Sequence, residues 1–363
     1  MPEGANVAQT AATVKLVCLR TAEIPVKKTE FDSGQACVFT LCTLIATAII
    51  QLPYCQEFII VSDRSAVLPQ YLFPKHAMTV FAGLVANAEA GGITTEIIRR
   101  FVRKYRVNME EAENPDIASY ASFNAFFTRA LRAGARPLAT AEYICPVDGA
   151  ISQFGPIEQD QIFQAKGHTY STTALVGGDA ALAAQFRNGS FATIYLSPRD
   201  YHRIHMPCDG RLTRMIYIPG TLFSVNPTTA RGVPGLFARN ERVVCVFESV
   251  KGPFVLTLVG ATIVGSMATV WHGVVNPPRT RAVREWTYAP GEVSLKKGDE
   301  MGRFLLGSTV VLLFPEHTLD FHEEWEAARP VRLGEALGHP MQGKTHVSLG
   351  YPDNQASQDA QQK

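Results

Sequence analysis

The chain has 363 residues, of which 46% are hydrophobic and 18% are charged, and its formal net charge is +1. This composition is sufficient for a packed core and excludes a wholly disordered chain. The near-neutral charge argues against a protein whose main partner is nucleic acid, so we expect no nucleic-acid partner.

Cysteine usage indicates a reduced, intracellular protein. The seven cysteines contain no CxxC pair, and their number is odd. This pattern predicts buried thiols rather than a disulfide framework or a zinc site, and we expect no bound metal. The cysteines are Cys18, Cys37, Cys42, Cys55, Cys145, Cys208 and Cys245.

The first 65 residues carry no catalytic pattern, so 1–65 is assigned as an extension of unknown role. Its stretch 36–50 is mostly apolar, and no residue between Asp32 and Glu57 is charged. The stretch is shorter than the roughly 20 strongly apolar residues of a membrane-spanning helix. It also lies too far from the start for an ordinary signal peptide. A buried helix or a poorly folded extension is the favoured interpretation, and a membrane span is the alternative.

Residues 66–135 are predicted to form a helical, membrane-associating region. Apolar residues recur at helical spacing over Ile93–Tyr105, and a second such pattern covers Ser122–Leu131. The phenylalanines of the second pattern are predicted to belong to the core. The first helix either lies on an anionic bilayer or is an ordinary surface helix with a solvated basic face. Its basic residues are Arg99, Arg100, Arg103 and Lys104.

After Pro137, short β-branched runs alternate with Gly, Pro and Asn turns, as is typical of strands. We therefore predict an α+β fold, in which membrane-facing N-terminal helices precede a β-rich catalytic core at 136–335. A polar tail at 336–363 is predicted to be disordered. The clearest strand patterns are Phe191–Leu196, Val243–Phe247, Phe254–Val259 and Val310–Phe314.

Four segments carry reactive side chains. An acid, two imidazoles and a hydroxyl can together activate a serine, because a base takes the hydroxyl proton and a carboxylate fixes the tautomer of that base. Each segment is weak alone, since two histidines at this spacing are more often structural or metal-bound and Gly-Ser-Thr is usually a turn. The segments are PVDGAIS with Asp148, DYHRIHMP with His202 and His205, LFSVNP with Ser224 and Asn226, and MGRFLLGST with Ser308.

In this order, the four segments resemble the phosphatidylserine decarboxylase family, and LGST at Leu306–Thr309 matches its processing signature. The resemblance runs from Leu72 into the 330s, with no departure at a motif position. Further segments that look like family sequence are QAKGHTYS, FRNGSFATIYLSPRDYHRIHMPCDG, LFARNERVVC, VGATIVGSMATVW and KKGDEMGRFLLGSTV. The extension at 1–65 has no counterpart in this resemblance.

The resemblance implies a carboxy-lyase that makes its own cofactor. Loss of CO₂ from an amino acid leaves a carbanion, which needs an electron sink that no side chain supplies. Ser308 Oγ would attack the carbonyl of Gly307, whose missing side chain leaves that carbonyl accessible. Cleavage would give a β chain, 1–307, and an α chain, 308–363, that begins with a pyruvoyl group. Phosphatidylserine would form a Schiff base with that group and release CO₂ to give phosphatidylethanolamine.

The same resemblance assigns roles to the site residues. His205 would be the base for Ser308, with Asp148 orienting it, and His202 would protonate the substrate carbon after CO₂ leaves. Ser224 and Asn226 would contact the serine or phosphate head group, or belong to a turn that packs beside the site.

A lipid substrate implies a peripheral protein on the cytoplasmic face of the cell membrane, and we expect an assembly of two β–α pairs. Two other classes of function remain alternatives. One is an uncleaved Ser/His/Asp hydrolase that acts on an external ester, and the other is a non-enzymatic lipid-binding β domain. A pyruvoyl enzyme acting on a soluble amino acid is a nearby third possibility.

Overall fold

The computed structural model describes residues 63–341, except 73, 263–265, 277–278 and 306–307. All of these residues belong to one compact unit. The apolar stretch 36–50 lies outside the described residues. Among the residues that are described, no helix combines the length and apolar content that crossing a bilayer requires.

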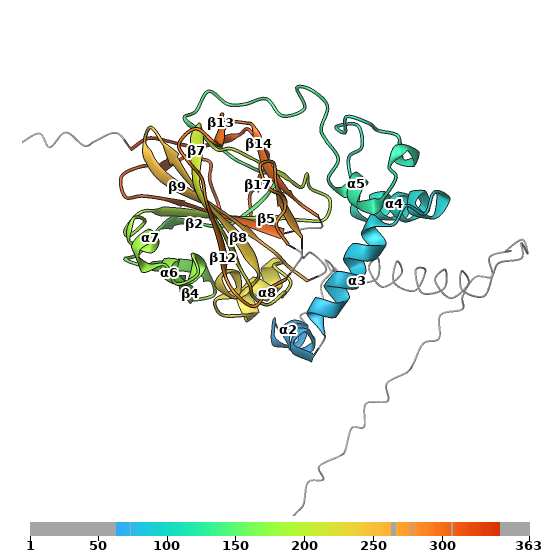
Figure 1. The fold of residues 1–363 in the computed structure, drawn as a ribbon, viewed down its shortest axis with the longest axis horizontal. Helices are drawn as coiled ribbons and strands as arrows, with labels where there is room; N and C mark the ends of the chain where they lie inside the picture. Colours follow the sequence, from blue (N-terminus) through green and yellow to red (C-terminus); the bar gives the residue numbers. More distant parts are fainter. Residues whose placement is uncertain (1–62, 73, 263–265, 277–278, 306–307, 342–363) are drawn as a thin grey trace, which may run out of the picture. The chain divides into compact units, whose positions relative to one another are not determined.

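The helices of the first part of the chain precede the strands, as predicted. Shorter helices occur later, between strands (Figure 1). The described helices are α2 (Asp63–Leu72), α3 (Lys75–Asn87), α4 (Gly92–Tyr105), the 3-10 turn η1 (Ile117–Ser119), α5 (Phe123–Phe127), α6 (Thr172–Leu175), α7 (Ala180–Ala184), α8 (Pro227–Gly232) and α9 (Leu236–Arg239).

The strands begin at Tyr143 and continue to His339. They are β1 (Tyr143–Ile144), β2 (Gly149–Pro156), β3 (Gln161–Ala165), β4 (His168–Ser171), β5 (Ser190–Leu196), β6 (Arg203–His205), β7 (Gly210–Ile218), β8 (Arg242–Ser249), β9 (Gly252–Val259), β10 (Met267–Thr269), β11 (Gly273–Val274), β12 (Arg284–Thr287), β13 (Ser294–Leu295), β14 (Glu300–Phe304), β15 (Ser308–Phe314), β16 (Asp320–Phe321), β17 (Pro330–Val331) and β18 (Ala336–His339). The α+β class and the four clearest strand predictions are confirmed.

A nine-stranded sheet forms the centre of the β-rich core among the described residues, in the order β12-β7-β8-β9-β15-β5-β2-β17, with β13 also paired to β7. Strand β15 is an inner strand, antiparallel to both β5 and β9. A smaller sheet has the order β11-β10-β14-β6. The chain therefore leaves the smaller sheet at Phe304 and enters the large sheet at Ser308.

Both faces of the large sheet are covered, and alternate residues of its inner strands contribute to two separate cores. Val311 of β15 packs into the core that also contains residues of α4 to α9, and Figure 1 shows α6, α7 and α8 at one side of the sheet. Val310 and Leu312 pack on the other face, with Ile204 of β6 and Met301 of β14. Burial on both faces explains why the inner strands read as continuous apolar runs.

The predicted amphipathic helix is α4, and it is attached by its aromatic face. Ile98 and Phe101 are buried. The Phe101 ring lies 5.0 Å from that of Phe123 and 5.9 Å from that of Phe126 in α5, at near-perpendicular angles that favour aromatic pairing. Ile93, which belongs to the same predicted apolar stripe, remains 40% exposed.

Two predicted boundaries were wrong. The helix predicted for Ser122–Leu131 spans only Phe123–Phe127, with Ser122 as its N-cap. It ends early because Leu131 pairs with Ala112 in an isolated β-bridge, which extended backbone requires. The tail predicted from residue 336 begins with strand β18, which pairs with β1 and buries Leu337. Short pairings of this kind leave no periodic pattern in the sequence.

The prediction of buried thiols is confirmed for the cysteines that the structure describes. Cys145, Cys208 and Cys245 are free and buried. Burial raises the pKa of the Cys208 thiol to about 12, so it stays protonated near neutral pH.

Candidate active site

The four predicted segments meet at one end of the large sheet. Ser308, the first residue of β15, pairs with Leu196, the last residue of β5, and the next residue of β15 pairs with Val259 at the end of β9. On the other side of β5, Ala150 at the start of β2 pairs with Tyr195. The segments that precede β2 and follow β5 therefore meet at the end of the sheet where β15 begins.

The segment with Ser224 and Asn226 reaches the same end through β7. Ile218, the last residue of β7, pairs with Arg242 at the start of β8, and Arg242 pairs with Val259. The chain after β7 thus begins at the edge where β9 ends and β15 starts. Gly307 lies outside the described residues, and Ser308 is placed by its backbone.

The histidine segment runs beside the segment that leads to the predicted cleavage point. The backbone N–H of Phe304 donates to the carbonyl of His202 at 3.0 Å. Four residues further along, Ser308 pairs with Leu196. Residues 196–202 and 304–308 are therefore held together at both ends, with His202 opposite Phe304 and Leu196 opposite Ser308.

His202 is a buried, neutral imidazole with one free nitrogen. Its Nδ1 lies 2.8 Å from the carbonyl oxygen of Asp200, which can only accept, so the proton is on Nδ1. Its Nε2 is buried and has no hydrogen-bond partner within the part of the chain that the structure describes. The ring centroid lies 4.0 Å from that of Phe127. Burial lowers the pKa of His202 to about 3, so Nε2 is a proton acceptor at neutral pH.

His205 has the same tautomer for the same reason. Its Nδ1 lies 2.8 Å from the carbonyl oxygen of Gly298, which leaves Nε2 to accept from the hydroxyl of Tyr201 at 3.1 Å. Burial lowers the pKa of His205 as well. A neutral imidazole with an available Nε2 is the form that a general base requires.

Asp148 is fixed mainly by Arg136. The guanidinium Nε and Nη2 of Arg136 donate to its carboxylate at 2.9 and 2.5 Å, and the backbone N–H of Leu333 donates at 2.9 Å. Among the described residues, no hydrogen bond joins Asp148 to His205, whose Nδ1 is oriented by Gly298 instead. The carboxylate is nevertheless close enough for its charge to favour protonation of His205. Its predicted orienting role stays a prediction.

Ser224 and Asn226 have local partners. The Asn226 side-chain oxygen accepts from the backbone N–H of Thr229 at 2.8 Å and caps α8. The Ser224 hydroxyl accepts from the backbone N–H of Asn226 at 3.4 Å, and the Ser224 N–H donates to Gln70 of α2 at 3.0 Å. These contacts fit the interpretation as a turn beside the site, while contact with a head group stays a prediction.

Several residues that complete this arrangement were not predicted. Arg136 fixes Asp148, Gly298 and Tyr201 fix His205, and Phe127 covers His202. The Phe127 ring belongs to a helix that was predicted only as core. No local pattern marks Arg136 or Gly298, because their partners are distant in the sequence.

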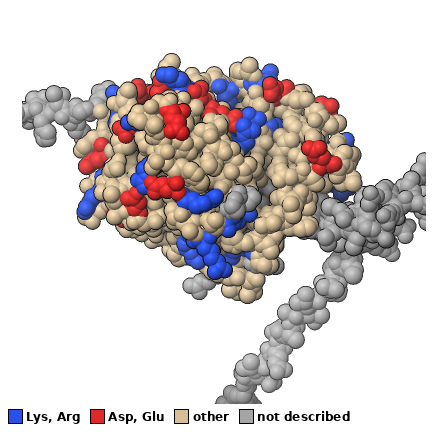
Figure 2. All heavy atoms as spheres, viewed as in Figure 1, with Lys and Arg blue, Asp and Glu red and all other residues tan. Residues whose placement is uncertain are grey.

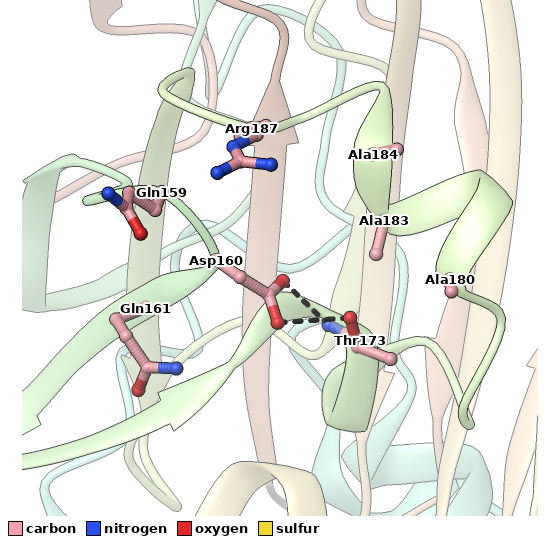
Figure 3. A pocket seen from close by; sticks show the side chains of 8 residues that line it. All are labelled: Gln159, Asp160, Gln161, Thr173, Ala180, Ala183, Ala184 and Arg187. Carbon is pink, nitrogen blue, oxygen red and sulfur yellow. Dashed lines mark hydrogen bonds between the residues drawn. The ribbon is translucent and has the colours of Figure 1, made fainter.

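A surface pocket of about 310 Å³ occurs elsewhere, between the start of β3 and helices α6 and α7. None of the predicted site residues lines it. Figure 3 shows its carboxylate, Asp160, directed at Thr173, whose hydroxyl and backbone N–H it accepts at 3.0 and 3.1 Å. Asp160 thus fixes the start of α6, and this pocket is no part of the candidate site.

Comparison with known proteins decides the family. A family model described as phosphatidylserine decarboxylase matches residues 123–339, and one described as PSD matches 65–106. The chain belongs to the phosphatidylserine decarboxylase family. The family resemblance of the catalytic segments is thereby confirmed, and the matched region begins a few residues before Leu72.

Three relatives match this chain over nearly their whole length. A phosphatidylserine decarboxylase proenzyme of Polaromonas naphthalenivorans is 78% identical over 279 residues, which are 76% of this chain and 96% of the relative. The proenzymes of Dechloromonas aromatica and Acidovorax ebreus are 74% and 75% identical, and 98% of each is covered. Membership of this family supports an enzyme rather than a non-enzymatic lipid-binding domain.

Proposed function

We propose that this chain is a phosphatidylserine decarboxylase that becomes active by cutting itself between Gly307 and Ser308. The observation that carries the proposal is the contact between the histidine segment and the chain before Ser308, because His202 bonds to Phe304, His205 pairs with Glu300, and Ser308 itself pairs with Leu196. The relatives' name, proenzyme, supports processing of this chain as well.

In the proposed cleavage, the chain's own groups move the protons. His205 Nε2 takes the proton of the Ser308 hydroxyl, either directly or through the Tyr201 hydroxyl that it binds. Ser308 Oγ adds to the Gly307 carbonyl, the C–N bond breaks, and the proton passes to the departing amine. The ester is then lost by elimination: the Cα proton of residue 308 is removed, its Cβ–O bond breaks, and the carboxylate of Gly307 ends the β chain. Water hydrolyses the dehydroalanine left at 308 to the pyruvoyl group, and ammonia is released.

The residues at the start of β15 fit a pyruvoyl group derived from Ser308. The new α-chain terminus would stay paired with Leu196 of β5, and the partnerless Nε2 of His202 lies in the segment beside it. This group supplies the electron sink for decarboxylation. His202 would hold at Nε2 a proton taken up during substrate binding and would deliver it to the substrate carbon.

We further propose that helices α2 to α4 contact the membrane on its cytoplasmic face. Apolar side chains on α2 and α3 are exposed, among them Leu68, Leu72 and Leu84 at 66, 82 and 67%. The basic residues of α4 are exposed on its outer face. Figure 2 shows that basic and acidic side chains are interspersed over most of the face in view. Exposed apolar residues beside basic ones suit an anionic bilayer.

Intact mass spectrometry tests the processing. The purified protein should consist of two polypeptides, 1–307 and a 308–363 chain whose blocked terminus reacts with hydroxylamine. Ser308→Ala should give one uncleaved, inactive polypeptide. A single uncut polypeptide with a free Ser308 hydroxyl that still decarboxylates phosphatidylserine would refute the proposal.

The expected assembly of two β–α pairs rests on the resemblance, and native mass spectrometry of the cleaved protein tests it.

A further inference from the structure

The chain after α5 lies directly on the histidine segment. The Phe127 ring covers His202, and the Thr128 carbonyl accepts from Nε of Arg203 at 2.8 Å. Arg129 follows immediately. Burial is the main cause of the low pKa of His202, and the charge of Arg129 lowers it further, which places the guanidinium within electrostatic range of that imidazole. Asp148 and Tyr201 also lie within electrostatic range of Arg129.

Arg129 is a buried cation that has no side-chain partner among the described residues. Its relative exposure is 5%, and its Nε is enclosed with no hydrogen bond. Among the residues that the structure describes, none forms an ion pair or a side-chain hydrogen bond with this guanidinium. Its central carbon lies 5.3 Å from the ring centroid of Phe126, a contact that offers the buried Nε no hydrogen-bond acceptor. A buried arginine is normally paired, because an unpaired charge is costly to bury.

Two other buried arginines of this chain follow that rule. Arg136 donates to both Asp148 and Glu111. Arg242 donates to the backbone carbonyls of Ala174, Leu175 and Asn240. The guanidinium groups of Arg136 and Arg242 thus have hydrogen-bond acceptors within the fold. Arg129, at the candidate site, has none among the described residues.

We propose that Arg129 binds an oxyanion of phosphatidylserine in the active site. This inference rests on the proposed function. The substrate carries two such groups, a phosphodiester and a carboxylate, and a guanidinium fork matches either. Tight binding of the carboxylate would stabilise the ground state and be lost as CO₂ leaves, whereas the phosphodiester keeps its charge throughout. The phosphodiester is therefore the expected partner.

The test uses cleaved enzyme and short-chain lipids. Arg129→Met and Arg129→Lys are compared with Arg132→Gln, a control at an exposed arginine without a side-chain bond to another described residue. Intact mass spectrometry establishes that each variant is cleaved. We expect Arg129→Met to raise KM for short-chain phosphatidylserine about ten- to a hundredfold, with a smaller effect on kcat, and Arg129→Lys to lie between. The control should match wild type.

Direct binding of the product separates the two oxyanions. Short-chain phosphatidylethanolamine keeps the phosphodiester and lacks the carboxylate. Equal loss of affinity for substrate and product in Arg129→Met assigns the phosphodiester, and loss for the substrate alone assigns the carboxylate. Unchanged affinity for both lipids, or a fall in kcat alone, overturns the inference.

If Arg129→Met does not fold, Arg129→Lys carries the test, with its unfolding midpoint as the check. An Arg129→Lys variant with wild-type stability and unchanged affinity for both lipids also overturns the inference. Failure of the proposed function has a different signature, because wild-type protein would then remain uncut or fail to release CO₂.

Discussion

At the scale of single residues, backbone carbonyls decide which nitrogen of each histidine is basic. Asp200 and Gly298 each face an Nδ1, so both rings present Nε2 as the proton acceptor. In a serine-activating triad a carboxylate has this task. Here the carboxylate of Asp148 is held by Arg136, and its effect on His205 is through space. The site therefore combines oriented bases with a separately fixed negative charge.

Burial of His202 predicts a pH-dependent stability. Its pKa in the folded state, about 3, lies below that of the unfolded chain, about 6.5, so the unfolded state binds more protons between these values. The contribution of His202 to the free energy of unfolding should be fully present above pH 6.5. Below that pH, and down to about pH 3, it should fall by about 1.4 kcal/mol for each pH unit. Denaturant titrations of uncleaved Ser308→Ala protein measure this slope. Adding His202→Asn should flatten it, and identical slopes in both proteins would contradict the assignment.

Loss of the arginine that binds Asp148 should destabilise the protein. Arg136→Met leaves a carboxylate with 10% side-chain exposure without its cation. Removing one partner of such a pair costs about 3 kcal/mol or more. We expect a lower unfolding midpoint in the Ser308→Ala background and slower self-cleavage when Ser308 is present. Arg332→Met is the matched control, since the Arg332 side chain is 62% exposed and forms an ion pair with Glu111. Equal effects of both changes would argue against a special role of Arg136.

At the scale of secondary-structure elements, the cap of α8 separates two roles of Asn226. Its side-chain oxygen caps the helix, so Asn226→Ala should cost about 1 kcal/mol. Asn226→Asp keeps the capping oxygen and removes the amide donor, so it should retain wild-type stability. If the amide contacts a head group, this variant should raise KM in a decarboxylation assay. An unchanged KM would leave capping as the function of Asn226.

The exposed face of α4 predicts electrostatic binding to membranes. Arg99 and Arg100 share Glu96 as an ion-pair partner, and Arg103 and Lys104 lie in the last turn. Each cation near an anionic bilayer contributes about 1 kcal/mol, so reversing all four to Glu should weaken vesicle binding more than tenfold. Co-sedimentation with phosphatidylglycerol vesicles measures this effect, which added salt should reduce. A protein with Arg187→Glu and Lys251→Glu is the control. Unchanged binding of the fourfold variant would refute membrane contact through α4.

At the scale of the whole molecule, the predicted cleavage point lies between two sheets. Strand β14, before the cut, pairs with β6 and β10, and β15, after it, pairs with β5 and β9. The α chain would thus supply an inner strand of the large sheet, buried on both faces. Strand β14 keeps its pairing with β6 and β10 after cleavage, and β15 keeps its pairing with β5 and β9. Cutting the bond therefore does not remove the contacts between the two polypeptides.

The two polypeptides should therefore remain together after cleavage. We expect 1–307 and 308–363 to co-elute in size-exclusion chromatography under native conditions and to separate only in denaturant. Removing an inner strand would expose apolar surface on both faces of the sheet, which is unfavourable in water. Dissociation of the small chain in native buffer would contradict this packing. High salt should not release it, because the contact is mainly apolar.

Much of the fold and part of the site followed from the sequence. Inner strands such as Phe254–Val259 read as unbroken apolar runs because both of their faces are buried, and the spacing of α4 is visible because one of its faces contacts the core. LGST and the two histidines identified the chemistry through family resemblance. Helix α5 and strand β18 were misjudged, because their ends depend on pairing with distant segments.

Only the tertiary structure decided which partners the reactive groups have. Gly298 orients His205 from 93 positions away, and Leu333 reaches Asp148 across 185. The sequence by itself determined which groups can react and which segments form strands, since periodicity and motif are local properties. Whether a buried charge such as Arg129 is neutralised depends on chain segments brought together by folding, and no local pattern records that.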